Sequence, residues 1–146
     1  MPVQAQVISP LSLVHVVCSG HMTEPELRAA LVEVYGDPDY RPGMPEVADM
    51  TTATFVDTAF DEHQLFVEDF NRTHEPAGKP TRVNFVRPEG QALLMIEMFR
   101  NLMEAQDSII PVDVVEGYPE VLALLDLEES DIAHFPEFCQ KDPGLL

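Results

Sequence analysis

Strand-like apolar segments alternate with helix-like segments along most of this chain, and this alternation most constrains its fold. Runs rich in β-branched and aromatic residues predict strands at 3–8, 11–18, 47–50, 81–87 and 109–115. Residues 51–56, which are also rich in such residues, should bridge the third strand to a turn. Apolar stripes at helical spacing predict helices at 23–36, 58–74, 91–104 and 118–127. The first should begin with a capping box formed by Thr23 and Glu26 and end near Gly36, a residue suited to a left-handed helix end. We therefore expect one α/β domain with a mixed, mostly parallel sheet of about five strands, covered by four helices. The first two strands should form an antiparallel hairpin at one edge of this sheet.

The predicted domain spans residues 1–127, and residues 128–146 form an acidic tail that either packs as an irregular arm or remains mobile. A chain of 146 residues is long enough for one domain with a real core. Its net charge of −18 repels phosphates and anionic lipid, which argues against nucleic acids and membrane surfaces as partners. No apolar run is long enough to span a bilayer, and the first residues lack the charged start of a secretory signal. We therefore expect a cytoplasmic protein.

The two cysteines show no metal-binding spacing, so neither a metal nor any other cofactor is predicted. Cys18 should be a buried thiol, and Cys139 an incidental one near the tail. His15 lies inside an apolar strand and is expected to be a hydrogen-bonded core residue. Asp61, Glu62 and His63 are neighbours on a helix and point in different directions, which disfavours a metal site there.

No motif for catalysis stands out. The sequence contains no glycine-rich phosphate loop and no nucleophile elbow. No catalytic residue is predicted, and we expect a protein that is not an enzyme. Spacing alone leaves open acid–base chemistry by paired carboxylates on so acidic a surface.

The stretch 46–61 is predicted to run from a short buried strand through a polar turn into a helix. Thr58 stands where its hydroxyl would cap that helix, and Asp57 lies near the positive end of the helix dipole. Helix capping by itself accounts for both residues. A functional interpretation comes from a resemblance.

Residues 47–58, with the sequence VADMTTATFVDT, resemble the strand–turn–helix signature of STAS domains, the anti-sigma-factor antagonists and their relatives. The order of elements over 3–127 is similar as well, and the loop 36–43 is similar to a STAS-like group of uncharacterised bacterial proteins. The family motif continues with Ser-Ser-Gly after its second Asp. Here Thr58 occupies the first of these positions, while Ala59 and Phe60 replace the following Ser-Gly.

The resemblance implies a non-enzymatic regulatory module that docks on a protein partner through the turn and helix at 57–63. In that family the residue at the position of Thr58 is phosphorylated, and phosphorylation breaks a protein complex. A phosphate at Thr58 would add negative charge beside Asp57 and Asp61 and could switch a docking surface. The candidate docking residues are Asp49, Asp57, Asp61, Glu62 and His63.

The helix at 91–104 supports an alternative function. Its apolar arc, wider than a surface helix needs, is typical of a deeply packed core helix. Its Leu94 and Met98 edge could instead contact a second subunit in a homodimer. A third possibility is a pocket for a small apolar ligand between this helix and the sheet, lined by Met95, Met98, Phe99 and Met103.

Overall fold

The computed structural model describes residues 2–75 and 81–145, and it confirms the predicted α/β fold as a single compact domain. Its sheet has five strands in the order β1-β2-β3-β4-β5, with β1 antiparallel to β2 and the other pairs parallel. The strands are β1 (Val3–Ile8), β2 (Leu13–Thr23), β3 (Glu46–Asp57), β4 (Val83–Val86) and β5 (Val112–Val115). The helices are α1 (Glu24–Tyr35), α2 (Phe60–His74), α3 (Gly90–Ala105) and α4 (Tyr118–Leu124).

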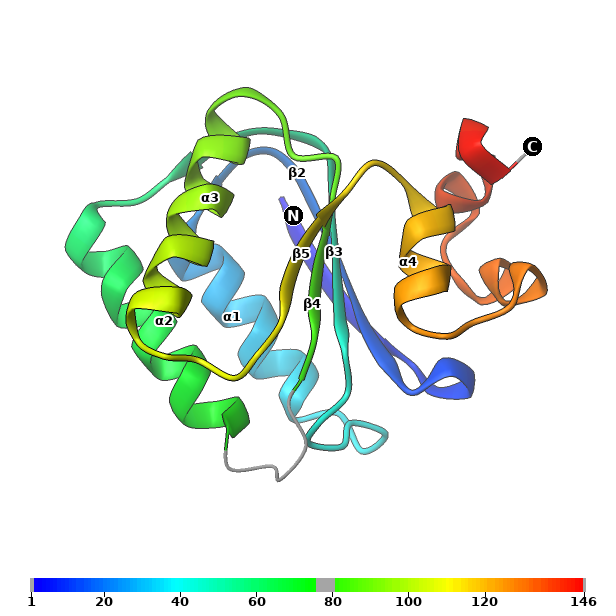
Figure 1. Cartoon of the computed structure of the whole chain (residues 1–146), viewed down its shortest axis with the longest axis horizontal. Helices are drawn as coiled ribbons and strands as arrows, with labels where there is room; N and C mark the ends of the chain where they lie inside the picture. The colour runs from blue at the N-terminus through cyan, green and yellow to red at the C-terminus, as the bar shows by residue number, and fades with distance from the viewer. Residues whose placement is uncertain (1, 76–80, 146) are drawn as a thin grey trace.

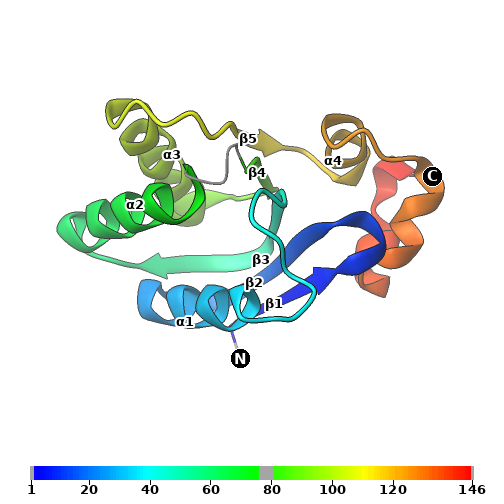
Figure 2. The ribbon, with the colours of Figure 1, turned by 90° about the horizontal axis from the view of Figure 1, so that it is seen from below.

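The two faces of the sheet are covered differently (Figures 1 and 2). Helices α1, α2 and α3 pack on one face, while α4 and the C-terminal turns pack on the other. Alternation along β2 serves both faces, because successive side chains of a strand point to opposite sides. Val14 and Val16 belong to the core under α1–α3, and Leu13 belongs to the core under α4.

The central strands β2 and β3 are longer than expected. We predicted a strand that gives way to a polar turn after residue 50, but β3 continues as a strand to Asp57. It pairs with β2 as far as the register Thr23↔Asp57, across two local shifts in register. Strand β4 pairs only with the first part of β3, from Glu46 to Asp49. The remainder of β2 and β3 therefore extends beyond the rest of the sheet, and both α1 and α2 begin close to its end.

The helix ends agree with the sequence in one case and differ in two. Thr23 and Glu26 form the predicted capping box at the start of α1. Gly36, expected to end that helix in a left-handed conformation, has a right-handed φ of −85°. Helix α2 begins at Phe60 after Ala59, and Thr58 donates its hydroxyl to the carbonyl of Ala59. The prediction that Thr58 caps this helix is therefore wrong, because β3 continues to Asp57 and delays the start of the helix.

The C-terminal segment belongs to the folded domain. The sequence left open whether this segment packs as an irregular arm or remains mobile, and the structure shows the packed state. The segment lies against the second face of the sheet as the short 3-10 helices η3 (Glu129–His134), η4 (Glu137–Lys141) and η5 (Pro143–Leu145). Phe135 and Cys139 are buried there beside Tyr118 and Val121 of α4. Across the described residues, no helix is long and apolar enough to cross a membrane.

Candidate functional site

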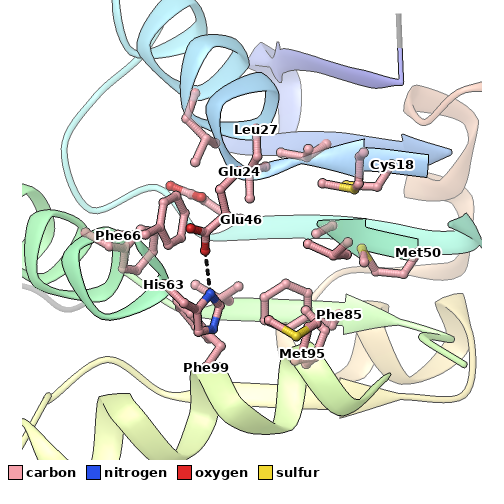
Figure 3. Close-up of a pocket in the computed structure, with 18 residues that line it drawn as sticks. Cys18, Glu24, Leu27, Glu46, Met50, His63, Phe66, Phe85, Met95 and Phe99 are labelled. Atoms are coloured by element: carbon pink, nitrogen blue, oxygen red, sulfur yellow. Dashed lines mark hydrogen bonds and ion pairs between the residues drawn. The ribbon is translucent and has the colours of Figure 1, made fainter. Parts of the chain in front are cut away.

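An apolar cavity of about 70 Å³ lies between the sheet and the helices α1, α2 and α3 (Figure 3). Strands β2, β3 and β4 form its floor. Its lining comprises Val16, Cys18, Met22, Glu24, Leu27, Leu31, Glu46, Ala48, Met50, Val56, His63, Phe66, Phe70, Val83, Phe85, Met95, Ile96 and Phe99. Rigid aromatic rings are prominent on the helix side of this lining, while its flexible methionines come from β2, β3 and α3. Such mixed packing leaves space more readily than interlocking branched side chains do.

Two polar side chains, Glu24 and His63, enter this apolar lining. They are 4% and 5% exposed, and His63 Nδ1 contacts a carboxylate oxygen of Glu24. Thr23 caps α1 directly before Glu24, which places the carboxylate in the first turn, at the positive end of the helix dipole. The ring of His63 packs against Phe66 and Phe99.

Each member of this pair keeps one polar atom without a hydrogen-bond partner. Glu24 Oε2 and His63 Nε2 are buried and have no partner among the described residues. Nearly all buried polar atoms in folded proteins are hydrogen-bonded. Two such atoms on adjacent side chains that both line one cavity therefore point to a missing hydrogen-bonding group there.

A second polar group, Glu46, lines the cavity from the start of β3. Its carboxylate accepts a hydrogen bond of 2.8 Å from the Tyr35 hydroxyl and lies 3.3 Å from His74 Nε2. Burial raises the pKa of Glu46 to about 7 and lowers that of His74 to about 4. Burial thus favours the neutral forms of both groups, and unlike Glu24, Glu46 has its hydrogen bonds within this network.

The structure separates the predicted docking residues into two groups. Asp57, Asp61 and Glu62 are exposed around the turn into α2, with Thr58 half-buried among them. Asp57 Oδ2 lies 3.7 Å from His21 Nε2. His63 is buried in the cavity lining, so its side chain does not reach that surface.

Asp49 also lies away from the predicted docking surface. Its side chain is 2% exposed and accepts a hydrogen bond of 2.6 Å from the hydroxyl of Tyr118, on the opposite face of the sheet from the cavity. Asp49 therefore belongs to the interior beneath α4. The prediction that it contributes to a docking surface is not compatible with this burial.

The residues predicted on helix α3 also fall into a buried group and a more exposed group. Met95 and Phe99 are buried and line the cavity, as the pocket hypothesis expected. Met98 is half-buried and outside the lining, and Leu94 is 69% exposed.

Sequence reasoning missed Glu24 and Glu46. A signal for Glu24 was present, since it falls three residues before Leu27 and seven before Leu31, on the apolar stripe of its helix. An acidic residue on such a stripe faces the interior. Glu46 directly precedes an apolar strand, and nothing in the local pattern distinguishes it from an exposed loop residue.

A comparison of the chain with models of protein families and with curated proteins found no match. The resemblance to STAS domains therefore rests on the motif at 47–58 and the order of elements.

Proposed function

We propose that this protein binds a small, mainly apolar molecule that carries one hydroxyl or similar hydrogen-bonding group, in the cavity beneath α1–α3. The observation that carries this proposal is the Glu24–His63 pair, whose two unpartnered atoms belong to a mainly apolar lining. Ligand sites typically combine such a lining with a few convergent polar groups. The polar pair would orient the ligand, and the aromatic and methionine side chains would cover its apolar part.

Hydrogen-bond energetics support a ligand with a donor group. A buried polar atom without a partner costs roughly 1–3 kcal/mol, and both Glu24 Oε2 and His63 Nε2 are in this position. A hydroxyl can donate its one proton to the carboxylate oxygen, and its own oxygen can accept a hydrogen bond from the imidazole nitrogen when that nitrogen carries a proton. A purely apolar molecule would leave both atoms unpaired.

The size of the cavity limits the ligand. Its volume of about 70 Å³ is roughly half that of an engineered cavity of about 150 Å³ that holds benzene. We therefore expect a ligand, or the buried end of one, of about three to five non-hydrogen atoms. The side chains of Met22, Met50 and Met95 can shift to admit a slightly larger group.

Methionine methyl groups provide a direct test. In protein labelled with ¹³C at the methionine methyls, a titration with 1-propanol should shift the signals of Met22, Met50 and Met95. The signal of Met98 should stay in place, because Met98 is on α3 but outside the lining. Equal shifts at all four methyls, or none at saturating alcohol, would contradict the proposal.

The polar end of the site has its own test. Glu24→Gln should weaken 1-propanol binding by about tenfold, because it removes a hydrogen bond to a charged group. The same substitution should change the affinity for 1-chloropropane, which has the same carbon chain and no donor, by less than about twofold. A parallel loss for both molecules would indicate a collapsed cavity rather than a lost hydrogen bond.

The surface around Thr58 supports a second candidate, a regulatory docking module in the cytoplasm. Its hydroxyl takes no part in capping α2, the acidic side chains Asp57, Asp61 and Glu62 surround it, and Phe60 is 59% exposed beside them. Capture of a partner protein from native cytosol by the wild type but not by Thr58→Glu would support this function. Mass spectrometry that finds Thr58 unmodified in cells under varied stress would count against a phosphorylation switch.

Self-association is a separate part of this second candidate. Leu94, 69% exposed, and the half-buried Met98 would form a subunit contact on α3. A native mass spectrum should then show a dimer that Leu94→Glu dissociates.

A further inference from the structure

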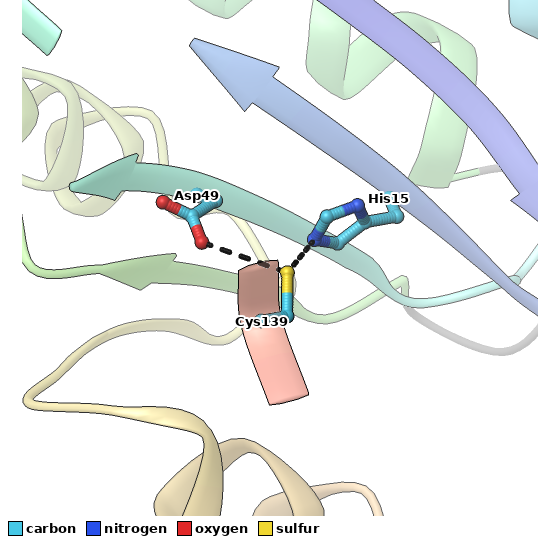
Figure 4. A group of neighbouring side chains, drawn as sticks. All are labelled: His15, Asp49 and Cys139. Carbon is cyan, nitrogen blue, oxygen red and sulfur yellow. Dashed lines mark hydrogen bonds between the residues drawn. The ribbon is translucent and has the colours of Figure 1, made fainter. Parts of the chain in front are cut away.

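A buried group of ligand-type side chains lies on the opposite face of the sheet from the cavity. His15 from β2, Asp49 from β3 and Cys139 from η4 converge there, as Figure 4 shows. The hydroxyl of Tyr118, at the start of α4, contacts all three. Each of the four residues is at most 2% exposed. The chain thus brings together four side chains that are far apart in sequence.

The distances in this group are close to those of a coordination site. Tyr118 Oη lies 2.9 Å from His15 Nε2, 2.6 Å from Asp49 Oδ2 and 3.1 Å from Cys139 Sγ. Cys139 Sγ lies 3.9 Å from His15 Nε2 and 4.0 Å from Asp49 Oδ2. Zinc bonds of about 2.0–2.3 Å in a tetrahedral site place the ligand atoms roughly 3.3–3.8 Å apart. The three distances to Tyr118 Oη are shorter than this range, and the two other distances from Cys139 Sγ are longer. Shifts of several tenths of an ångström would bring the ligand atoms to the tetrahedral spacing.

We propose that His15, Asp49, Cys139 and Tyr118 form a binding site for Zn²⁺. One sulfur, one imidazole nitrogen and oxygen ligands are a donor set that suits zinc. The ion would replace the protons now shared in the hydrogen bonds around the Tyr118 oxygen, with the thiol and phenol protons released to water.

The surroundings favour a structural rather than a catalytic site. All four ligands come from the protein and are buried, and structural zinc sites are closed in this way, whereas catalytic ones keep an open position. The ligands join the two central strands to α4 and to the C-terminal turns. Zinc would therefore fasten the C-terminal segment to the sheet. This site is independent of the cavity, which lies on the other face.

Cobalt substitution tests the proposal. Full-length protein stripped of metal with a chelator is titrated with Co²⁺, and the thiolate-to-cobalt charge-transfer absorption is recorded. The wild type should develop this band with one equivalent of Co²⁺, and Zn²⁺ should displace it. Cys139→Ser, which keeps a hydroxyl able to donate to Tyr118, should abolish the band. Cys18→Ser is the matched control, because Cys18 is the other cysteine, buried on the cavity face, and this variant should keep the band.

Two outcomes would overturn the site. One is the absence of a charge-transfer band in folded wild type, which would leave Tyr118 as the centre of a hydrogen-bonded cluster only. The other is a band that persists in Cys139→Ser. Should Cys139→Ser fail to fold, X-ray absorption of zinc-loaded Cys18→Ser decides the question without it. One sulfur at about 2.3 Å supports the site, and a shell of nitrogen and oxygen alone rejects it.

Discussion

At the scale of single residues, this protein places charged and polar groups inside an apolar interior in three networks. These are Glu24 with His63, Glu46 with Tyr35 and His74, and the four residues around Tyr118. Buried ion pairs seldom add net stability, because desolvation offsets their attraction. Unpartnered buried atoms remain at Glu24 Oε2 and His63 Nε2 in the first network and at His15 Nδ1 in the third.

The Glu24–His63 pair should show strong coupling in a double-mutant cycle. His63→Phe leaves the Glu24 carboxylate buried without its partner and should destabilise the protein by about 3–5 kcal/mol. The double variant Glu24→Met/His63→Phe removes both polar groups and should recover most of this loss. Urea unfolding measures the free energies. A double variant as unstable as the sum of its two single variants would show that the pair does not act as a unit.

Glu46 should make stability fall as the pH rises. Burial raises its pKa in the folded state from 4.5 to about 7, so between these values the folded state binds more protons than the unfolded one. Stability due to the protonated form is complete below about 4.5 and lost as the pH passes 7, a change of about 3 kcal/mol. Glu46→Gln cannot ionise, so its stability relative to wild type should increase between pH 5 and 8. A constant difference over this range would contradict the argument.

At the scale of elements, alternation and helical spacing predicted which strands and helices exist, and tertiary pairing decided where they end. The stripe containing Met95 and Phe99 is buried as its spacing predicts. Local chemistry at Thr58 predicts a helix cap, but the pairing of β3 with β2 as far as Asp57 overrides it. The two parts of the candidate site differ in how far the sequence predicts them. The methionine side could be read from the sequence, whereas Glu24 and His63 are 39 residues apart and meet only in the fold.

The Gln91 side chain of α3 makes the backbone hydrogen bonds to Val56 that a neighbouring strand would otherwise make. The amide of Gln91 accepts a hydrogen bond of 2.7 Å from the Val56 N–H and donates one of 2.8 Å to the Val56 carbonyl. Gln91→Ala should leave both groups of buried Val56 unpaired and cost about 1–3 kcal/mol. Hydrogen exchange of the Val56 amide should accelerate.

Glu104→Ala, on the exposed side of the same helix, is the control and should change stability by less than about 0.5 kcal/mol. An unchanged exchange rate at Val56 in Gln91→Ala would show that the glutamine amide does not protect this N–H.

At the scale of the whole molecule, one sheet separates two interiors with different contents. The face under α1–α3 contains the cavity, and the face under α4 contains the Tyr118 cluster and the C-terminal turns. Asp142 strengthens the attachment of these turns, since it accepts the backbone N–H of Tyr118 at 2.9 Å and pairs with Arg87 at 2.8 Å. An irregular acidic segment gives no periodic signal, so its place in the core could not be read from the sequence.

Truncation should distinguish a tail from a structural segment. A chain ending at Leu127 loses Phe135, Cys139 and Asp142 from the second interior and should lose more than about 3 kcal/mol of stability. A chain ending at Asp142 keeps all three and should lose less than about 1 kcal/mol. If the chain ending at Leu127 unfolds at the same urea concentration as the full chain, the C-terminal segment contributes nothing to the core.

A crystal structure of the protein with 1-propanol would show directly whether the cavity binds an alcohol. The proposed function predicts electron density for the alcohol in the cavity, with its oxygen within about 3.2 Å of Glu24 Oε2 or His63 Nε2. Its carbon chain should lie against Met95 and Phe99, which line the cavity. An empty cavity at high alcohol concentration, or an alcohol whose oxygen contacts neither Glu24 nor His63, would contradict the account.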